Sequence, residues 1–375
     1  MTGHIQRRGE RSWRLKFDLG RDQLTGKRET RFHTFRGTKR EAQAELTRLT
    51  AEAQRGTYVE ASAETAGGFM ERWVRDWATA NVSPKTLERY DQLSRNQIIA
   101  HIGNKPLQKL RPVDLNELYG ALLRDGLSPR TIGHAHRLLH RALGHAVTWE
   151  LVVKNVAAAV RPPRVTVEEI EIIREGELAA VLKKLRGQPL YMIAMLALSS
   201  GMRRGELLAL RWQDVDLDAG LVRVERSLEE TDAGGLRFKA PKTKQGRRSI
   251  TIPPSTVTDL RAHWKEQQEQ RLAIGAGKAP ADALVFPKLD FTARSPNVFS
   301  KEWREAKTGV GFHALRHTHA SSLIAAGVDV LTVSRRLGHA KPTTTLNVYS
   351  HLFRNTDDRA AQVIEDLFRK VRRSE

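Results

Sequence analysis

Five short segments in the second half of the chain carry cationic side chains that could bind an anion and a hydroxyl that could attack it. Paired arginines follow a turn-like glycine, two lysines share a polar loop, and a His-x-x-Arg motif, a Leu-Gly-His motif and a tyrosine come later. In chain order these residues are Arg203 and Arg204, Lys242 and Lys244, His313 and Arg316, His339, and Tyr349. Each segment alone is weak evidence, since a single Arg-Arg pair is usually an ordinary exposed helix start.

The residue types suit attack on a phosphodiester. Negative charge gathers on the non-bridging oxygens in that reaction, and guanidinium groups such as those of Arg203 and Arg316 can clamp it in a bidentate manner. A tyrosine hydroxyl has a pKa of about 10, so ionising it at neutral pH costs roughly 4 kcal/mol. A nearby base must therefore help Tyr349, and His313 is the candidate for this role.

Taken in order, these segments resemble the tyrosine recombinase family of phage integrases, whose catalytic domain carries an arginine box, a hairpin lysine, His-x-x-Arg, Leu-Gly-His and a downstream tyrosine. Ser200 stands where many relatives have threonine, and both offer a hydroxyl. The resemblance implies that Tyr349 is the nucleophile and that Arg204 is only a neighbour. The other implied catalytic residues are Arg203, Lys242 with Lys244 as its rival, His313, Arg316 and His339.

The implied reaction breaks and rejoins DNA through a tyrosyl ester. Because that ester stores the energy of the broken bond, no ATP, metal or other cofactor is expected. The lysine would protonate the leaving 5′ oxygen, and His339 would hydrogen-bond the phosphate. Glu206 is expected to orient Arg203 through a salt bridge. His136, His140 and His145 lack acidic residues at ligand spacing, so we expect surface or DNA-facing histidines and no metal site.

Composition is consistent with a nucleic-acid partner. Lys and Arg total 63 against 43 Asp and Glu, a formal charge of +20. Such an excess attracts polyanions, although charge alone does not decide function. Cysteine is absent, which excludes disulfides and thiolate chemistry. No signal peptide or membrane-spanning run is recognised, so no membrane partner and a cytoplasmic, nucleoid-associated location are expected.

The length predicts two or three domains, and the pattern of strand-like and helical segments predicts a multidomain α+β protein whose first domain is expected over 1–60. Alternation over 4–35, with Trp13, Leu15 and Phe17 on one face, predicts strands joined by a turn at 20–27. Thr38 and Glu41 form a capping box that starts a helix running to about residue 53. This small sheet with a helix resembles an arm-type DNA-binding domain, in which Arg14 and Arg31 are candidate DNA contacts.

A linker is expected at 61–68, followed by an all-α domain over 64–162. Ser128-Pro129 and Ser83-Pro84 both look like helix starts, and prolines end the domain near 162. The helix after Ser128 should bury Ile132, Leu138, Leu139 and Leu143. By resemblance this is a core-binding domain, with Lys85, Arg89, Arg130, Arg137 and Arg141 as candidate phosphate contacts.

The mixed α/β catalytic domain is expected over 168–375. It should contain helices at 176–185, 190–199 and 205–210 and strands at 221–224 and 248–252, with the two lysines at the tip between strand-like runs. After Tyr349, residues 357–371 predict an amphipathic helix with Ala360, Val363, Ile364, Leu367 and Phe368 on its apolar stripe. This tail could pack on its own domain or on a neighbouring protomer.

The function implied is a site-specific recombinase that integrates and excises a phage or other mobile element. Its expected partners are double-stranded DNA attachment sites, further copies of itself in a tetramer on DNA, and also an excisionase and a host DNA-bending protein. Two alternatives remain: a type IB topoisomerase, which shares the chemistry, and a DNA-binding regulator on the same fold without catalysis.

Overall fold

The computed structural model of the 375-residue chain describes residues 3–21, 26–166, 171–241, 243–353 and 357–373. The chain forms two compact units, Met1–Thr166 and Val167–Glu375, and each is described by itself. The multidomain, helix-rich fold with a small N-terminal sheet is the predicted fold class. Within the described ranges, no helix is long and apolar enough to cross a membrane.

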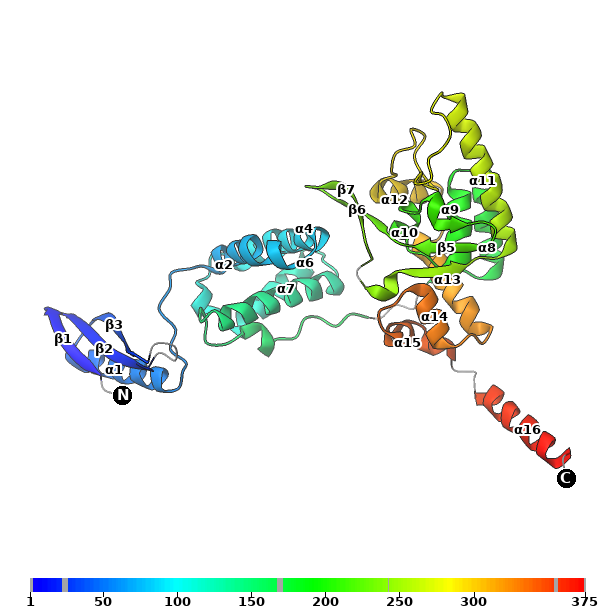
Figure 1. The fold of residues 1–375 in the computed structure, drawn as a ribbon. Helices are drawn as coiled ribbons and strands as arrows, with labels where there is room; N and C mark the ends of the chain where they lie inside the picture. The colour runs from blue at the N-terminus through cyan, green and yellow to red at the C-terminus, as the bar shows by residue number, and fades with distance from the viewer. Residues whose placement is uncertain (1–2, 22–25, 167–170, 242, 354–356, 374–375) are drawn as a thin grey trace. The chain divides into compact units, whose positions relative to one another are not determined.

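The first unit begins with an antiparallel sheet in the order β1-β2-β3, and helix α1 covers one of its faces (Figure 1). Leu15 and Phe17 are fully buried against α1, which confirms the predicted alternation. The predicted turn at 20–27 is described only at its two ends, since 22–25 lie outside the described residues. The elements are β1 His4–Gly9, β2 Ser12–Arg21, β3 Arg28–Arg36 and α1 Lys39–Gln54.

The start of α1 is fixed by the predicted capping box. The Glu41 carboxylate accepts from the Thr38 backbone N–H at 2.7 Å, and the Thr38 hydroxyl accepts from the Glu41 N–H at 3.3 Å. These bonds satisfy backbone donors that have no partner within the helix. The helix therefore begins where the sequence places it.

The rest of the first unit is helical, with its own core around the fully buried Trp73, Leu115 and Ile132. Two π-helical stretches, Trp73–Ala78 and Ser94–Ile99, join shorter α-helices, and 3-10 turns lie at Leu107–Lys109 and Val156–Ala159. The α-helices are α2 Ala66–Arg72, α3 Thr79–Asn81, α4 Pro84–Leu93, α5 Ala100–Ile102, α6 Pro112–Arg124 and α7 Pro129–Thr148.

The predicted linker at 61–68 is too long, because α2 already begins at Ala66 with Thr65 as its N-cap. Gly67 donates its N–H to the Gly103 carbonyl at 2.9 Å, and a Cβ on Gly67 would lie 3.1 Å from that oxygen. The glycine that suggested a flexible linker instead allows close packing of two backbones.

The second unit combines helices with two small antiparallel sheets of order β4-β5-β8 and β6-β7. Short 3-10 turns lie at Trp212–Asp214, Lys244–Gly246 and Ser350–Phe353. The strands are β4 Val215–Asp216, β5 Leu221–Val224, β6 Ser227–Thr231, β7 Gly235–Lys239 and β8 Arg248–Thr251. The helices are α8 Glu175–Leu185, α9 Leu190–Ser200, α10 Arg204–Leu208, α11 Pro254–Ala273, α12 Pro296–Glu305, α13 Phe312–Ala325, α14 Val330–Leu337, α15 Pro342–Tyr349 and α16 Asp357–Arg373.

The connection over 240–247 that carries Lys242 and Lys244, called the lysine loop below, does not join two paired strands. β7, which precedes it, pairs with β6, whereas β8, which follows it, pairs with β5. The loop therefore crosses from one sheet to the other, and the expectation of a hairpin tip is wrong. Strand-like runs on both sides were visible in the sequence, but their pairing partners lie elsewhere in the chain.

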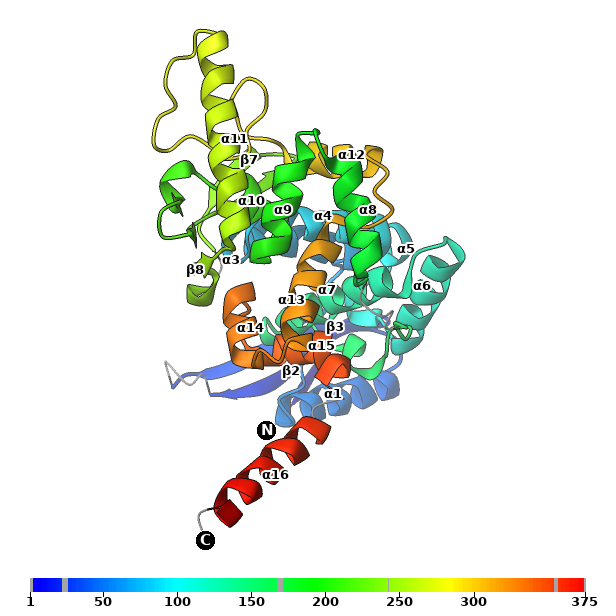
Figure 2. The ribbon, with the colours of Figure 1, turned by 90° about the vertical axis from the view of Figure 1, so that its right-hand side faces the viewer.

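The helical core of the second unit surrounds α9, in which Ile193, Ala194 and Leu196 are buried. Helix α13 packs along α9 and contacts α14, and α15 packs on α14 (Figure 2). The predicted tail helix is present as α16, and its apolar stripe is open to solvent, with Val363 61% and Phe368 50% exposed. The side chain of Ala360 lies outside what the structure describes.

Candidate active site

Helix α13 carries three polar side chains toward one region of the second unit. Phe312, at its start, packs edge-on against Phe299 and Trp303, which fixes the N-terminal end of the helix. His313, Arg316 and His317 follow at helical spacing and lie on one face. The local apolar anchor thus positions the imidazoles and the guanidinium together.

Arg316 is buried, with 3% of its surface exposed. It donates to the Gly201 carbonyl at 2.5 Å and to the Leu337 carbonyl at 2.8 Å. These carbonyls lie at the C-terminal ends of α9 and α14, where the helix dipole is negative and cations are favoured. Burial, followed by the nearby Arg203, lowers the pKa of Arg316 to about 9, so the group stays charged at neutral pH.

Two glycines allow these helix ends to meet the site. Gly201 has φ +67° and Gly338 has φ +66°, the left-handed region that glycine adopts without strain. A Cβ on Gly201 would lie 2.6 Å from the His319 ring, and one on Gly338 would lie 2.7 Å from an Arg248 nitrogen. Both positions therefore need glycine for conformation and for space.

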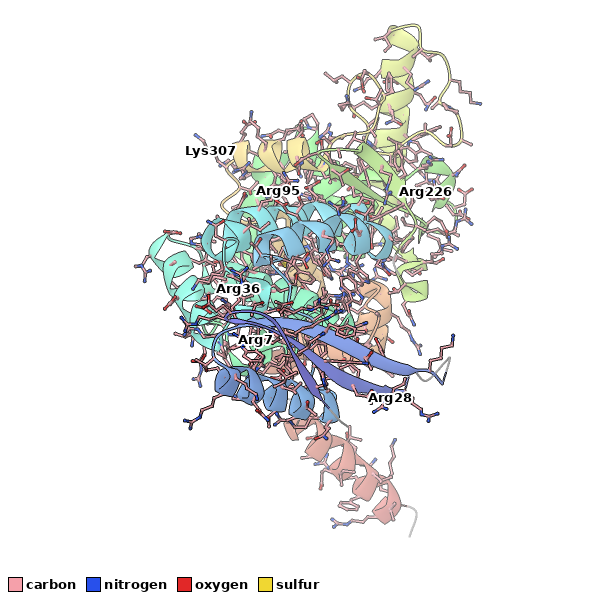
Figure 3. The ribbon with its side chains drawn as sticks, turned by 90° about the vertical axis from the view of Figure 1, so that its left-hand side faces the viewer. Arg7, Arg28, Arg36, Arg95, Arg226 and Lys307 are labelled. Atoms are coloured by element: carbon pink, nitrogen blue, oxygen red, sulfur yellow. The ribbon has the colours of Figure 1, made fainter. Side chains whose placement is uncertain are left out.

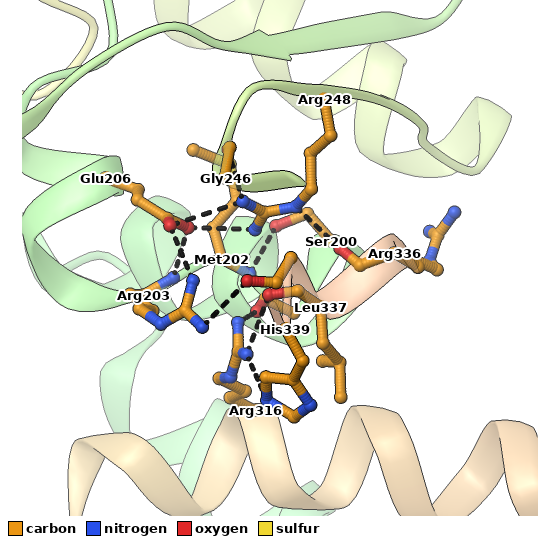
Figure 4. A network of polar contacts seen from close by, with 12 residues as sticks. Ser200, Met202, Arg203, Glu206, Gly246, Arg248, Arg316, Arg336, Leu337 and His339 are labelled. Carbon is orange, nitrogen blue, oxygen red and sulfur yellow. Dashed lines mark hydrogen bonds and ion pairs between the residues drawn. The ribbon is translucent and has the colours of Figure 1, made fainter. Parts of the chain in front are cut away.

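Arg203 lies beside Arg316 in a polar network (Figure 4). It donates to Glu206 at 2.9 Å and to the Gly338 carbonyl at 3.2 Å. The salt bridge predicted between Arg203 and Glu206 is thus present. Burial would raise the pKa of Glu206, but hydrogen bonds and charges from Arg248 and Arg203 outweigh burial and hold it below its usual range. Arg204 turns instead to the Ser300 hydroxyl on α12.

His339 lies between Arg316 and α15. A guanidinium group can only donate hydrogen bonds, so Arg316 donates to Nε2 of His339 at 3.0 Å. Nδ1 of His339 then carries the ring hydrogen and donates to the Thr345 hydroxyl at 2.8 Å. Burial and the charges of Arg316 and Arg203 lower the pKa of His339 to about 4. The imidazole is neutral here, and its Nε2 must gain a proton before it can donate to an oxyanion.

Tyr349, the last residue of α15, is only 1% exposed, and its hydroxyl lies 2.8 Å from Nδ1 of His317. Burial raises the pKa of Tyr349 to about 12, against the lowering effect of Arg316. The sequence pointed to His313 as the base for this tyrosine. In the structure His313 instead stacks edge-on against His317 at 4.8 Å, and His317 makes the contact.

The histidines of this region are held neutral. Burial, with His317 and Arg316 next, lowers the pKa of His313 to about 4, although part of its side chain remains open to solvent. Burial and Arg316 also lower the pKa of His317. Arg203, Arg316, His313, His339 and Tyr349 therefore lie together in a cationic cluster that combines one buried and one half-exposed guanidinium group with neutral imidazoles and a phenol. Such a site suits a tetrahedral anion attacked by an oxygen nucleophile.

The lysines cannot be placed against this cluster. Lys242 lies outside the described residues, and the side chain of Lys244 is not described, although its backbone begins the 3-10 turn Lys244–Gly246. The choice between them stays a prediction.

The candidate phosphate contacts of the first unit lie on α4 and α7, which pack together. Arg89, Arg130 and Arg137 are exposed, and all three are close enough to His134 to lower its pKa, after the larger effect of burial. Arg141 is exposed and lies over the Trp77 ring at 4.6 Å. Lys85 forms an ion pair with Glu88. The predicted burial of Ile132, Leu138, Leu139 and Leu143 on α7 is confirmed.

The two arginines proposed on the N-terminal sheet lie on opposite faces. Arg14 lies over the exposed Phe32 at 4.1 Å, on the face away from α1. Arg31 pairs in register with the buried Phe17, on the side of α1, and binds Glu29 at 2.7 Å. Figure 3 shows further arginines of this sheet, Arg7 on β1 and Arg28 and Arg36 at the two ends of β3.

Of the three histidines expected at the surface of α7, His140 is exposed, whereas His136 and His145 are partly buried. His145 accepts from the indole N–H of Trp73 at 2.8 Å and packs among Trp77 and Trp149, and His136 bonds to the Tyr119 hydroxyl at 2.7 Å. Surface positions were expected because the helix is basic, but Trp73 and Trp77 of the π-helical stretch and Trp149 after α7 pack around His145. Among described residues, no group of acidic or histidine side chains could hold a metal.

Sequence reasoning missed His317 and Arg248. His317 could have been found, because it follows His313 by four residues and therefore shares its helical face. No local pattern distinguished Arg248, which reaches Glu206 across 42 positions of the chain.

Residues 171–356 match the model of the phage integrase family, and residues 65–123 match that of the phage integrase N-terminal SAM-like domain. A XerC-like tyrosine recombinase of Caldanaerobacter subterraneus subsp. tengcongensis is 27% identical and covers 96% of this chain and 97% of its own. The ICEBs1 integrase of Bacillus subtilis is 28% identical and covers 70% of this chain and 72% of its own.

Two solved structures show the same fold. The Tn1549 transposon integrase in complex with transposon right end DNA has a TM-score of 0.67 at 22% identity, covering 81% of this chain and 99% of its own. A lambda integrase dimer bound to a COC' core site has a TM-score of 0.56 at 16% identity, covering 94% and 95%.

Proposed function

Because this chain belongs to the phage integrase family of tyrosine recombinases and is a site-specific DNA recombinase, we propose that Tyr349 is its nucleophile and that the cluster around Arg316 is its catalytic site. One observation carries this assignment. The Tyr349 hydroxyl is hydrogen-bonded to an imidazole and lies near Arg316, which in turn lies beside Arg203, so a bound anion would balance the two positive charges. A phosphodiester supplies that anion.

In the proposed reaction the phenolic oxygen attacks the scissile phosphorus, and His317 takes the phenolic proton. A bond forms between the Tyr349 oxygen and phosphorus, and the bond between phosphorus and the 5′ oxygen of the next nucleotide breaks. The product is a 3′-phosphotyrosyl enzyme. Lys242, or Lys244 as its rival, gives a proton to the departing 5′ oxygen. Attack by a 5′ hydroxyl from the partner strand reverses each step, so the chain needs no external energy source.

The two arginines would bind the non-bridging oxygens. Each preorganised donor in such a site contributes about 10²–10³ in rate. His339 would join them once the phosphate charge favours protonation of Nε2. Because Tyr349 is 1% exposed and Arg316 is 3% exposed, DNA binding must open this region before the phosphorus can reach the phenol.

DNA is the partner that family membership supports, and we infer that the substrates are double-stranded attachment sites. The resemblance to an ICEBs1 integrase and a Tn1549 transposon integrase favours integration and excision of a mobile element. Such a protein acts on the nucleoid in the cytoplasm. An excisionase and a host DNA-bending protein are further partners that we propose for directionality.

For the parts of the chain we infer an arm-type domain over 1–60, a core-binding domain over 64–162 and a catalytic domain over 168–375. The basic face of α4 and α7 would contact core-site phosphates through Lys85, Arg89, Arg130, Arg137 and Arg141. Of the two arginines proposed on the small sheet, Arg14 is the better candidate, since Arg31 lies on the side of α1. We also infer a homotetramer on DNA, in which the exposed apolar stripe of α16 binds a neighbouring copy.

Nicked suicide duplexes tiled across the DNA that flanks the gene test the proposal, without metal or ATP. The wild-type chain should form a denaturation-resistant protein–DNA adduct that Tyr349→Phe loses. Tight DNA binding without any adduct would instead favour a catalytically silent DNA-binding protein.

A further inference from the structure

Arg248 connects the segments that build the proposed site. This residue begins β8, directly after the lysine loop, and its side chain is only 6% exposed. Its guanidinium donates to both carboxylate oxygens of Glu206, at 2.8 and 3.2 Å (Figure 4). It also donates to the Arg336 carbonyl at 2.7 Å and to the Gly246 carbonyl at 3.1 Å. One side chain thus joins the arginine box, the Leu-Gly-His turn and the lysine loop.

The space around Arg248 is closely fitted. A Cβ on Gly338 would lie 2.7 Å from the Nη1 atom of Arg248, so the glycine before His339 leaves room for this guanidinium. The Gly338 carbonyl in turn accepts from Arg203. The turn that carries His339 is therefore held between two arginines.

The charges explain why a second arginine is useful there. Glu206 is buried and contacts both Arg203 and Arg248. If Glu206 faced Arg203 alone, the charges of the carboxylate and the guanidinium would cancel, and Arg203 would attract a phosphate only weakly. With Arg248 present, one negative charge is shared between two positive ones, and the group of three keeps a formal charge of +1.

We propose that Arg248 is a positioning residue for DNA cleavage. It shares the charge of Glu206, which keeps Arg203 available to the scissile phosphate, and it fixes the ends of the lysine loop and of the Leu-Gly-His turn. Arg248 acts through these groups and does not touch the phosphate. This inference rests on the proposed function, since it assigns a role within the same site.

The test measures single-turnover adduct formation by the full chain on a nicked suicide duplex that the wild-type chain cleaves. Arg248→Met should slow this step by about 10- to 100-fold while DNA affinity changes little, as expected for loss of a residue that supports catalytic groups. On a duplex with a neutral methylphosphonate at the scissile position, the slowing should be smaller, because the missing charge on Arg203 then matters less. Adding Glu206→Gln to Arg248→Met should restore part of the rate, since the glutamine no longer neutralises Arg203.

Arg294→Met is the matched control. Arg294 is also largely buried and binds Glu302 at 3.1 Å and the Pro287 carbonyl at 3.4 Å, none of which belongs to the site. The Arg294→Met substitution should reduce thermal stability without slowing DNA cleavage by the folded protein. If Arg248→Met does not fold, Arg248→Gln, which loses the charge and keeps hydrogen-bond donors, carries the same comparison.

A wild-type rate in Arg248→Met would overturn the proposal, and so would an equal loss on both substrates with no recovery in the double variant. The proposed function fails in a different way: the wild-type chain itself would form no adduct, or Tyr349→Phe would keep it.

Discussion

The Tyr349 hydroxyl lies 2.8 Å from Nδ1 of His317, one helical turn beyond the His-x-x-Arg histidine. Burial and Arg316 lower the pKa of His317, so its imidazole is neutral at pH 7 and able to accept a proton. The Glu171 carboxylate acts in the opposite direction and favours the imidazolium that forms after transfer. This pair is the proposed acid–base couple for cleavage.

His317→Ala should therefore slow single-turnover cleavage by about 10²-fold or more. The wild-type rate should rise with pH up to the lowered pKa of His317 and stay level above pH 7. The variant has no imidazole at this position, and the pKa of Tyr349 is about 12, so its rate should keep rising above pH 7. Rates across pH 5 to 9 provide the comparison. A large loss in His313→Ala together with none in His317→Ala would assign the proton transfer to His313.

The general acid can be identified by changing the leaving group. A substrate with sulfur in place of the bridging 5′ oxygen releases a thiolate, whose conjugate acid has a pKa of about 8.5 and needs no proton donor. Lys242→Ala should be slow on the oxygen substrate and recover on the sulfur substrate, whereas Lys244→Ala should behave like wild type on both. The converse pattern would give the role to Lys244.

His319 links stability to pH. Arg336 donates to its Nε2 at 3.0 Å, and its Nδ1 bonds to the Leu198 carbonyl at 2.7 Å, so only the neutral form fits. Burial, with Arg336 next, lowers its pKa to about 4 from about 6.5. Between these pH values the unfolded chain binds more protons at His319 than the folded chain does. The contribution of neutral His319 to stability is therefore complete above pH 6.5 and is lost as pH falls toward 4.

At pH 5 this one group should cost about 2 kcal/mol of unfolding free energy relative to pH 7. His319→Gln can form the same two hydrogen bonds without titrating, so its stability should fall less over this range. Urea unfolding of both proteins at pH 7 and pH 5 checks the difference. Equal losses in the two proteins would show that His319 is not the titrating group.

The basic face of α4 and α7 predicts a change in salt dependence. Each phosphate contact contributes about 0.9 to the slope of log K against log salt. Replacing Arg89, Arg130 and Arg137 with alanine should lower that slope by up to roughly 3, on core-site and unrelated DNA alike. Arg124→Ala, an exposed arginine of α6 in the same unit, is the control. A slope that responds to Arg124 and not to the triple variant would place the DNA on another face.

Features that depend on local chemistry could be predicted from the sequence. The capping box of Thr38 and Glu41, the serine cap and proline at Ser128-Pro129, and the buried stripe of α7 all follow from neighbours a few residues apart. The order of the motifs also predicted that Arg203, His313, His339 and Tyr349 gather around Arg316, although it missed His317 and Arg248. Such signals need no knowledge of the tertiary fold.

Features that depend on distant partners could not be predicted. The strands on either side of the lysine loop joined different sheets, because their pairing partners β6 and β5 lie elsewhere. Arg31 shares a strand with exposed residues, and only the position of α1 places it on the covered face. The choice between His313 and His317 depends on the position of Tyr349 at the end of α15. The spacing of residues within α13 holds no information about that position.

If Tyr349 is the nucleophile, it carries the DNA in the covalent adduct, and mapping the site of attachment tests this most directly. After nuclease and trypsin digestion, the peptide from Leu337 to Arg354 contains Tyr349 as its only tyrosine. Fragmentation mass spectrometry should find a 3′-phosphonucleotide on that residue. A nucleotide attached to any other side chain would contradict the account.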